Sequence, residues 1–101
     1  MASLSLISIV VSTAIEDTLV DWLLERDGVP GFTSMPINGH GSSVRSLSLK
    51  EQVSGSKRQI LFQIYLPSEQ ARLIIEALKQ DFMGSGLHYW LVPVEDAGRL
   101  E

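Results

Sequence analysis

The side chains between Arg58 and Leu66 alternate in a way that leaves few folds open to this chain. Successive residues of a strand point to opposite faces of a sheet. One face of this strand would carry only apolar residues, and the other would still include Leu61 and Tyr65. Pro67 then ends the strand because proline cannot donate to a β-ladder. The segment therefore predicts a strand with large side chains on both faces.

Two helical patterns and three further strand patterns surround this segment. Thr13 with Glu16 matches a capping box and predicts a first helix, while Ser68 is the expected cap of a second helix. The apolar residues of both helices recur at helical spacing. The three further strands are predicted over residues 3–11, within residues 29–38 and over residues 87–94. The order of elements is β-α-β-β-α-β.

This order predicts a single α+β domain over residues 1–101 with a ferredoxin-like βαββαβ fold. Right-handed crossovers would give a four-stranded antiparallel sheet with both helices on one face. The other face would expose residues such as Tyr65 and Trp90, because two helices cannot cover both faces. Since a bare apolar face of this kind is typical of an association site, we expect an oligomer.

Charge and composition exclude several classes of function. The net charge is −4, which argues against nucleic acid as a partner because such binding rests on clustered Lys and Arg. The chain contains no cysteine, which excludes thiolate metal sites and thiol catalysis and fits a cytoplasmic protein. The apolar run of Met1–Ser12 is interrupted by serines and is too short to span a bilayer. We therefore expect no direct membrane insertion.

Two glycine-containing segments are candidates for a functional role. Gly84, Ser85 and Gly86 come directly before the last strand, and the backbone N–H groups of such a turn can bind an anion. The alternative is a tight turn that requires glycine for a positive φ. The second segment is Gly39-His40-Gly41, which opens a long polar stretch over residues 39–57. Loops of that length inside a compact domain are usually functional or mobile.

The chain resembles the PII-like signalling proteins, which are ferredoxin-like trimers with their sheets packed inward. The resemblance is carried by Gly28-Val29-Pro30-Gly31-Phe32-Thr33, Gly39-His40-Gly41, Gly84-Ser85-Gly86 and the terminal segment with Pro93 and Arg99. It implies a homotrimer with a shortened effector loop at about residues 39–57. It also implies an adenine nucleotide or another anion in the cleft between subunits, bound by Gly39, His40, Gly41, Gly84, Ser85, Gly86 and Arg99.

The chain departs from the classical PII pattern at the glycine turn before the last strand. Classical members have a lysine after the second glycine, where it meets nucleotide phosphates, and here that position is Leu87. The aspartate between the two glycines is replaced by Ser85. These departures predict that the usual nucleotide contacts are weakened.

A narrower resemblance is to a small subgroup of uncharacterised bacterial proteins that are often encoded beside heavy-metal efflux systems. It rests on Gly31-Phe32-Thr33-Ser34, Glu51-Gln52-Val53-Ser54-Gly55 and Tyr89-Trp90, among other segments. In this context His40 and His88 could share a divalent transition metal, with Glu51 or Glu95 adding oxygen ligands, because imidazole suits Zn, Ni and Cu. The alternative is that each histidine has a structural place in its loop or strand.

Three functions follow from these observations. The first is a trimeric regulatory or sensor protein whose ligand orders residues 39–57. The second is a metal-binding tolerance protein similar in outline to the CutA trimers. The third is an adaptor whose loop docks on a membrane efflux transporter or another protein without any ligand. We expect no catalysis, because the sequence contains neither a Gly-x-Ser-x-Gly elbow nor a convergent pair of carboxylates.

Overall fold

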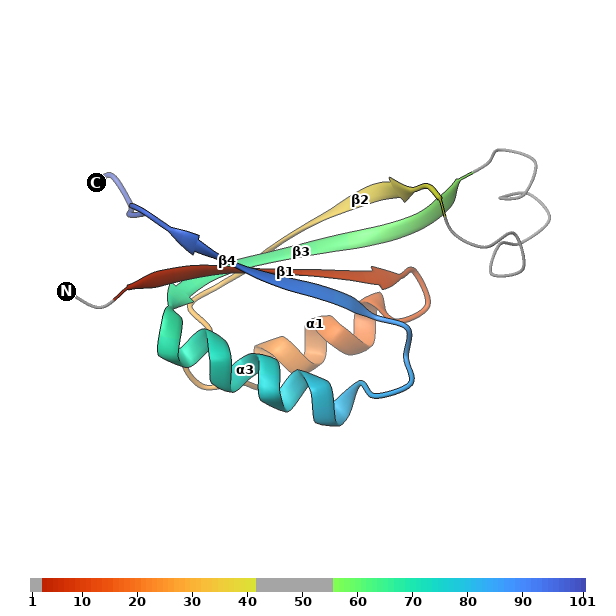
Figure 1. Ribbon diagram of the computed structural model, residues 1–101, viewed down its shortest axis with the longest axis horizontal. Coiled ribbons are helices and arrows are strands. Elements are labelled where there is room, and N and C mark those ends of the chain that lie inside the picture. The colour runs from red at the N-terminus through yellow and green to blue at the C-terminus, as the bar shows by residue number, and fades with distance from the viewer. Residues whose placement is uncertain (1–2, 42–55) are drawn as a thin grey trace.

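The computed structural model describes residues 3–41 and 56–101 and confirms the predicted order of strands and helices. Both helices lie on one side of the sheet (Figure 1). Neither helix in this part of the chain is long and apolar enough to cross a membrane. The elements are β1 (Leu4–Ser12), α1 (Glu16–Leu24), β2 (Thr33–Gly39), β3 (Lys57–Pro67), α3 (Ser68–Asp81) and β4 (His88–Val94).

The sheet is antiparallel, with the strand order β2-β3-β1-β4. β1 and β3 are the central strands, so β2 and β4 form the two edges. Each edge strand contains a proline, Pro36 in β2 and Pro93 in β4. Residues that are paired in the register share a face, and Ile9 of β1 is opposite both Phe62 of β3 and Tyr89 of β4.

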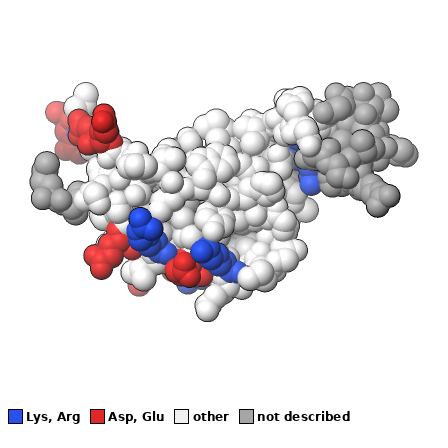
Figure 2. Space-filling view, in the orientation of Figure 1, with Lys and Arg blue, Asp and Glu red and all other residues white. Residues whose placement is uncertain are grey.

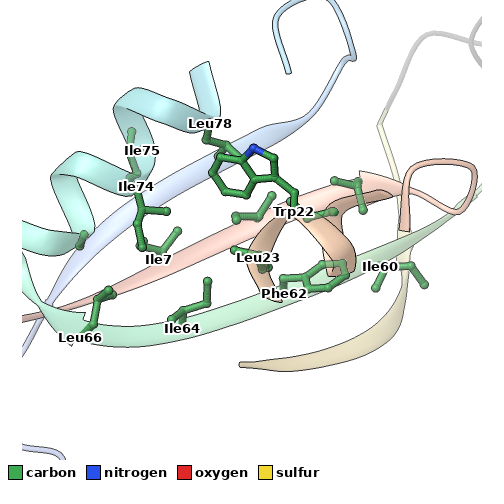
Figure 3. Close-up of a cluster of buried hydrophobic side chains, with 14 residues drawn as sticks. Ile7, Trp22, Leu23, Ile60, Phe62, Ile64, Leu66, Ile74, Ile75 and Leu78 are labelled. Carbon is green, nitrogen blue, oxygen red and sulfur yellow. The ribbon is translucent and has the colours of Figure 1, made fainter. Parts of the chain in front are cut away.

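The hydrophobic core lies between the sheet and the two helices (Figure 3). As the alternation predicts, Phe62 and Ile64 of β3 are buried there. Full burial of a side chain of this size contributes roughly 1.5–3 kcal/mol. The other core residues are Ile7, Ile9 and Val11 of β1, Leu19, Trp22 and Leu23 of α1, Ile60 and Leu66 of β3, and Ala71, Ile74, Ile75 and Leu78 of α3.

The two predicted helix caps are wrong. Ile15, not Thr13, occupies the N-cap position of α1, and no side chain among the described residues caps it. A backbone bond of 3.1 Å from the Ile15 N–H to the Ser12 carbonyl closes the preceding turn instead. Pro67 is the N-cap of α3, and the Ser68 hydroxyl pairs with the Ser5 hydroxyl at 2.6 Å. That hydroxyl therefore joins the helix to β1 and is not used as a local cap.

A polar cluster joins the ends of α1 and α3. The indole N–H of Trp22 donates to the Oδ2 atom of Asp81 at 2.7 Å, and Arg26 donates to the same oxygen at 3.2 Å. The Arg26 guanidinium also lies 4.1 Å from the centre of the Trp22 ring, in cation–π geometry. These contacts fix the last turn of α3, and with it the start of the glycine turn before β4.

The sheet face away from the helices is called the open face below. The large apolar side chains that it exposes are Met35, Tyr65, Trp90 and Val92. Ser8 lies between Gln63 and Trp90 in the register of this face. Its hydroxyl is buried and has no hydrogen-bond partner among the described residues. The open face thus combines exposed apolar area with an unsatisfied hydroxyl, as expected of a surface that is completed by association.

Candidate functional site

The two glycine segments lie at opposite edges of the sheet. Gly39 is the last residue of β2 and Gly41 comes just after it, whereas Gly84–Gly86 comes before β4 (Figure 1). Three strand spacings separate these edges, which amounts to about 14 Å. One chain therefore does not bring the two segments together, and a shared site would need a second chain.

The Gly84–Gly86 turn requires glycine because of its backbone conformation. Gly84 and Gly86 have φ values of +83° and +80°, which residues with a side chain rarely adopt. The Ser85 hydroxyl accepts a bond from the Leu87 N–H at 3.2 Å, and the Ser85 N–H donates to the Phe82 carbonyl at 3.1 Å. The polar groups of Ser85 thus hold the turn together. Binding of an anion by this turn stays a prediction.

Gly39 is a glycine for a different reason. Its φ is not positive, but the side-chain oxygen of Gln59 occupies the place that a Cβ at residue 39 would need. Gln59 therefore packs against the bare backbone of Gly39 across the β2–β3 pair. Gly41, by contrast, has a φ of +81° and serves a turn. The Gly39-x-Gly41 motif combines a close packing position with a turn position.

His40 and His88 are both exposed but lie far apart in one chain. His88 is level with Met35 of β2 in the register, and Gly39 is four residues, about 13 Å, further along β2. Two histidines that share a metal each place a nitrogen about 2 Å from it. Within the described ranges, no group of three His, Cys, Asp or Glu side chains could hold a metal ion. A metal shared by His40 and His88 would therefore need two chains.

Arg99 lies in the exposed tail that follows β4, where it forms an ion pair with Glu101 at 3.6 Å. The seven residues of β4, about 23 Å, separate this tail from the Gly84–Gly86 turn of the same chain. Charged side chains gather at this C-terminal end and along α3 (Figure 2). Arg99 could therefore meet a ligand at a glycine turn only in a neighbouring chain.

The residue that replaces the classical lysine is directed toward the core. Leu87 is half-buried and packs against the core cluster. Lys79 of α3 is a cation that lines the same pocket as Leu87, and its ammonium lies 3.3 Å from the Glu76 carboxylate. Hydrogen bonding to Glu76, and then to Tyr89, raises the pKa of Lys79 above its ordinary value of 10.5. Lys79 is therefore charged but already paired.

Sequence reasoning missed a hollow with a mixed polar and apolar lining at the start of β2. It has a volume of about 260 Å³ and is lined by Pro30, Gly31, Phe32, Thr33, Gln63 and Tyr65. Thr33 is opposite Gln63 in the register, so both belong to the open face. The alternation in β3 already placed Gln63 and Tyr65 on this face. The sequence does not indicate that β2 pairs with β3 in this register, which brings Thr33 beside Gln63 and Tyr65.

Residues 42–55 of the predicted effector loop, including the proposed metal ligand Glu51, lie outside the described residues. The structure describes the two ends of this loop. Gly39 is the last residue of β2, and Lys57 is the first residue of β3.

Solved structures resemble this chain over almost its whole length. A DUF3240 family protein from Shewanella baltica OS155 is 24% identical, with all of both chains covered and a TM-score of 0.79. The nitrogen regulatory PII-like protein CPII from Thiomonas intermedia K12, bound to ADP, AMP and bicarbonate, is 20% identical, with 97% of both chains covered and a TM-score of 0.70. CutA from Synechococcus elongatus PCC7942 is 15% identical, covering 93% of this chain and 79% of CutA, with a TM-score of 0.68.

These likenesses show that the chain has the fold of the PII-like proteins. A search of curated proteins finds no match to the sequence. A comparison with known protein families matches residues 1–101 to the family described as "Protein of unknown function (DUF3240)". The match covers the whole sequence, and the protein therefore belongs to the DUF3240 family.

Proposed function

We propose that this protein is a small, non-catalytic regulatory protein. It assembles as a homotrimer, binds a small ligand between neighbouring subunits and signals through residues 39–57. The observation that carries the proposal is the open face. Tyr65 and Trp90 are each 46% exposed there, and Ser8 has a buried hydroxyl without a described partner. A closed assembly that packs these faces together would bury the apolar area and could satisfy the hydroxyl.

The positions of the edge strands support a ligand site between subunits. In a cyclic assembly each contact joins two different surfaces of the subunit, so the β2 side of one chain can face the β4 side of the next. Such an arrangement would bring Gly39–Gly41 of one chain near Gly84–Gly86 of its neighbour. It would also offer a way for Arg99 to meet a ligand outside its own chain. The geometry of a single chain is thus compatible with a site that only the assembly completes.

An adenine nucleotide is the ligand class that we propose for this site. In that arrangement Arg99 of a neighbouring chain would supply a positive charge for the phosphates. The solved CPII structure contains ADP and AMP, which makes these compounds the first probes to use. Because Leu87 replaces a cation near the glycine turn, we expect weaker binding of the phosphates than of the base.

The signalling step would be an ordering of residues 39–57 when the ligand binds. The proposed target is a protein, and the resemblance to proteins encoded near metal efflux systems points to a membrane efflux transporter. Pull-down of that transporter by the full-length protein, but not by a variant lacking residues 42–55, would support this step. Equal recovery by both variants would contradict it.

Light scattering and calorimetry test the main proposal. We expect a particle with three times the chain mass of 11.1 kDa, and saturable heats with ADP or ATP. Arg99→Ala should weaken nucleotide binding, whereas Arg72→Ala, at an exposed arginine of α3, is the matched control. Leu87→Lys should strengthen the binding of ADP relative to adenosine, because it restores a cation near the phosphates. A monomer, or no heat at millimolar nucleotide, would contradict the proposal.

A metal-binding function similar to that of CutA is the second candidate. It is favoured by the exposure of both His40 and His88, which leaves their imidazoles accessible to an ion. A Zn²⁺, Ni²⁺ and Cu²⁺ titration on the His40→Ala and His88→Ala variants tests it. Both variants should lose affinity if the site is shared. If neither does, the paired-histidine site is wrong.

A further inference from the structure

A small hollow lies between the last turn of α3 and the start of β4, on the helix-covered side of the sheet. Its volume is about 180 Å³, and we call it the α3–β4 pocket. Tyr89, which is opposite the core residue Ile9 in the register, belongs to its wall. The residues that line the pocket are Leu78, Lys79, Phe82, Met83, Gly84, Gly86, Leu87 and Tyr89.

The walls of the α3–β4 pocket are held in place without a ligand. The Phe82 ring meets the Trp22 ring edge to face, with 5.6 Å between the ring centres. The Phe82 N–H donates to the Leu78 carbonyl at 2.9 Å, and Leu78 itself is buried in the core. Leu87 packs against the same core. The pocket is therefore largely preformed, which lowers the ordering cost of binding.

The charge at the mouth of the pocket disfavours an anion. Lys79 supplies a positive charge there, but its ammonium is paired with the Glu76 carboxylate and lies 5.8 Å from the centre of the Tyr89 ring. The carbonyl end of α3, which carries the negative end of the helix dipole, adjoins the pocket. A carboxylate or phosphate would have to displace Glu76 from Lys79. A cation would in turn meet the ammonium of Lys79.

The size of the pocket suits a single aromatic ring. An enclosed apolar cavity of roughly 150 Å³ in another protein accommodates benzene. The α3–β4 pocket has a similar volume of about 180 Å³ but is open to solvent on one side, where a small substituent of the ring could lie. Met83 is 82% exposed at the mouth, and its flexible thioether could close over such a ring. We propose that the α3–β4 pocket binds a neutral, single-ring aromatic compound.

The α3–β4 pocket shares Gly84 and Gly86 with the proposed site between subunits, but it opens on the inner side of the glycine turn, toward α3. All of its lining residues come from one chain, so binding requires neither the trimer nor a nucleotide. The proposal also explains why position 87 is a leucine. Classical PII proteins have a lysine there, whereas in this chain Leu87 forms part of the apolar wall of the pocket. The failure of one proposal would leave the other standing.

A titration followed by NMR tests the proposal, with phenol as the neutral probe. Benzoate and benzylamine are the matched anion and cation. Phenol should shift the signals of the Met83 methyl group, Leu87 and Tyr89 in a saturable way, with a dissociation constant on the order of 1 mM. The charged compounds should bind at least about ten-fold more weakly. No saturable shift with phenol, or equal affinity for benzoate, would overturn the proposal.

Variants at the pocket locate the binding site. Leu87→Phe fills the pocket with an apolar side chain and should weaken phenol binding about ten-fold or more. Met83→Ser, at an exposed position where loss of folding is not expected, should weaken it about three-fold. Leu73→Ala, an exposed leucine of α3 outside the pocket, should leave it unchanged. Phenol binding that is unaltered by both Leu87→Phe and Met83→Ser would show that the ring binds elsewhere.

Discussion

The helix-covered face and the open face of the sheet are built from the same strands but differ in what their side chains contact. On the covered face Phe62 and Ile64 are fully buried against α1 and α3. On the open face Tyr65, next along the same strand, remains 46% exposed. One face therefore stabilises the single chain, while the other is available for association. The two faces can be tested separately.

Replacement of Phe62 by alanine should destabilise the fold most strongly. Phe62 is buried at the centre of the covered face, so truncation removes apolar contacts and leaves a cavity. The free energy of unfolding should fall by about 3–5 kcal/mol. Urea denaturation at matched protein concentration measures the change. A loss below about 1 kcal/mol would mean that the covered face is not the main source of stability.

Replacement of Trp90 by lysine should separate assembly from folding. Trp90 is a large, half-exposed residue of the open face, so the charge should abolish the oligomer. The unfolding free energy of the single chain should change by no more than about 1 kcal/mol. Light scattering and circular dichroism measure the two effects. An oligomer that stays intact in the Trp90→Lys variant would show that the open face is not the interface.

Replacement of Ser8 by alanine distinguishes an open face that is exposed to solvent from one that packs against a neighbouring subunit. In the single chain the buried hydroxyl has no partner among the described residues, so its removal should stabilise a dissociated monomer by up to about 1 kcal/mol. If a neighbouring subunit bonds the hydroxyl, the same change should weaken the oligomer. Melting of the Trp90→Lys monomer, with and without Ser8→Ala, provides the first measurement. Dilution of the oligomer provides the second.

The pH dependence of the contact between α3 and β4, at the edge of the covered face, should give the weakest signal. The folded state raises the pKa of Lys79 through hydrogen bonds to Glu76 and Tyr89. The stabilisation is complete below the unfolded value of 10.5 and is lost as the pH rises through the folded pKa. Melting curves of the unchanged protein and of Lys79→Gln should converge as the pH is raised from about 9 to about 12. A constant difference over this range would contradict the assignment.

The repetitive parts of the fold could be predicted from the sequence. The alternation in β3 assigned Phe62 to the covered face and Tyr65 to the open face, and the helical spacing identified the buried face of α3. The caps could not be predicted in this way. The Ser68 hydroxyl could cap its own helix or form a hydrogen bond with the distant Ser5. Only the folded chain brings the Ser5 hydroxyl within 2.6 Å of it. Local patterns do not carry that information.

The candidate site was predictable only in part. The sequence identified both glycine segments, but it did not distinguish the reasons for glycine. Gly84 needs a positive φ, whereas Gly39 must leave room for Gln59, and that second requirement depends on strand pairing. The hollow beside Thr33 was missed for the same cause, since its walls come from two segments about 30 residues apart. Contacts between chains lie beyond any pattern within one chain.

The prolines of the two edge strands have a consequence for solubility. A strand edge with unpaired backbone groups can recruit further strands without limit, and this is how cross-β aggregates grow. Pro36 and Pro93 each remove a backbone donor from an edge strand. Both edge strands of the sheet are therefore poor templates for fibril growth. Pro36 and Pro93 thus oppose polymerisation along the sheet edges of a chain that exposes Tyr65 and Trp90 on its open face.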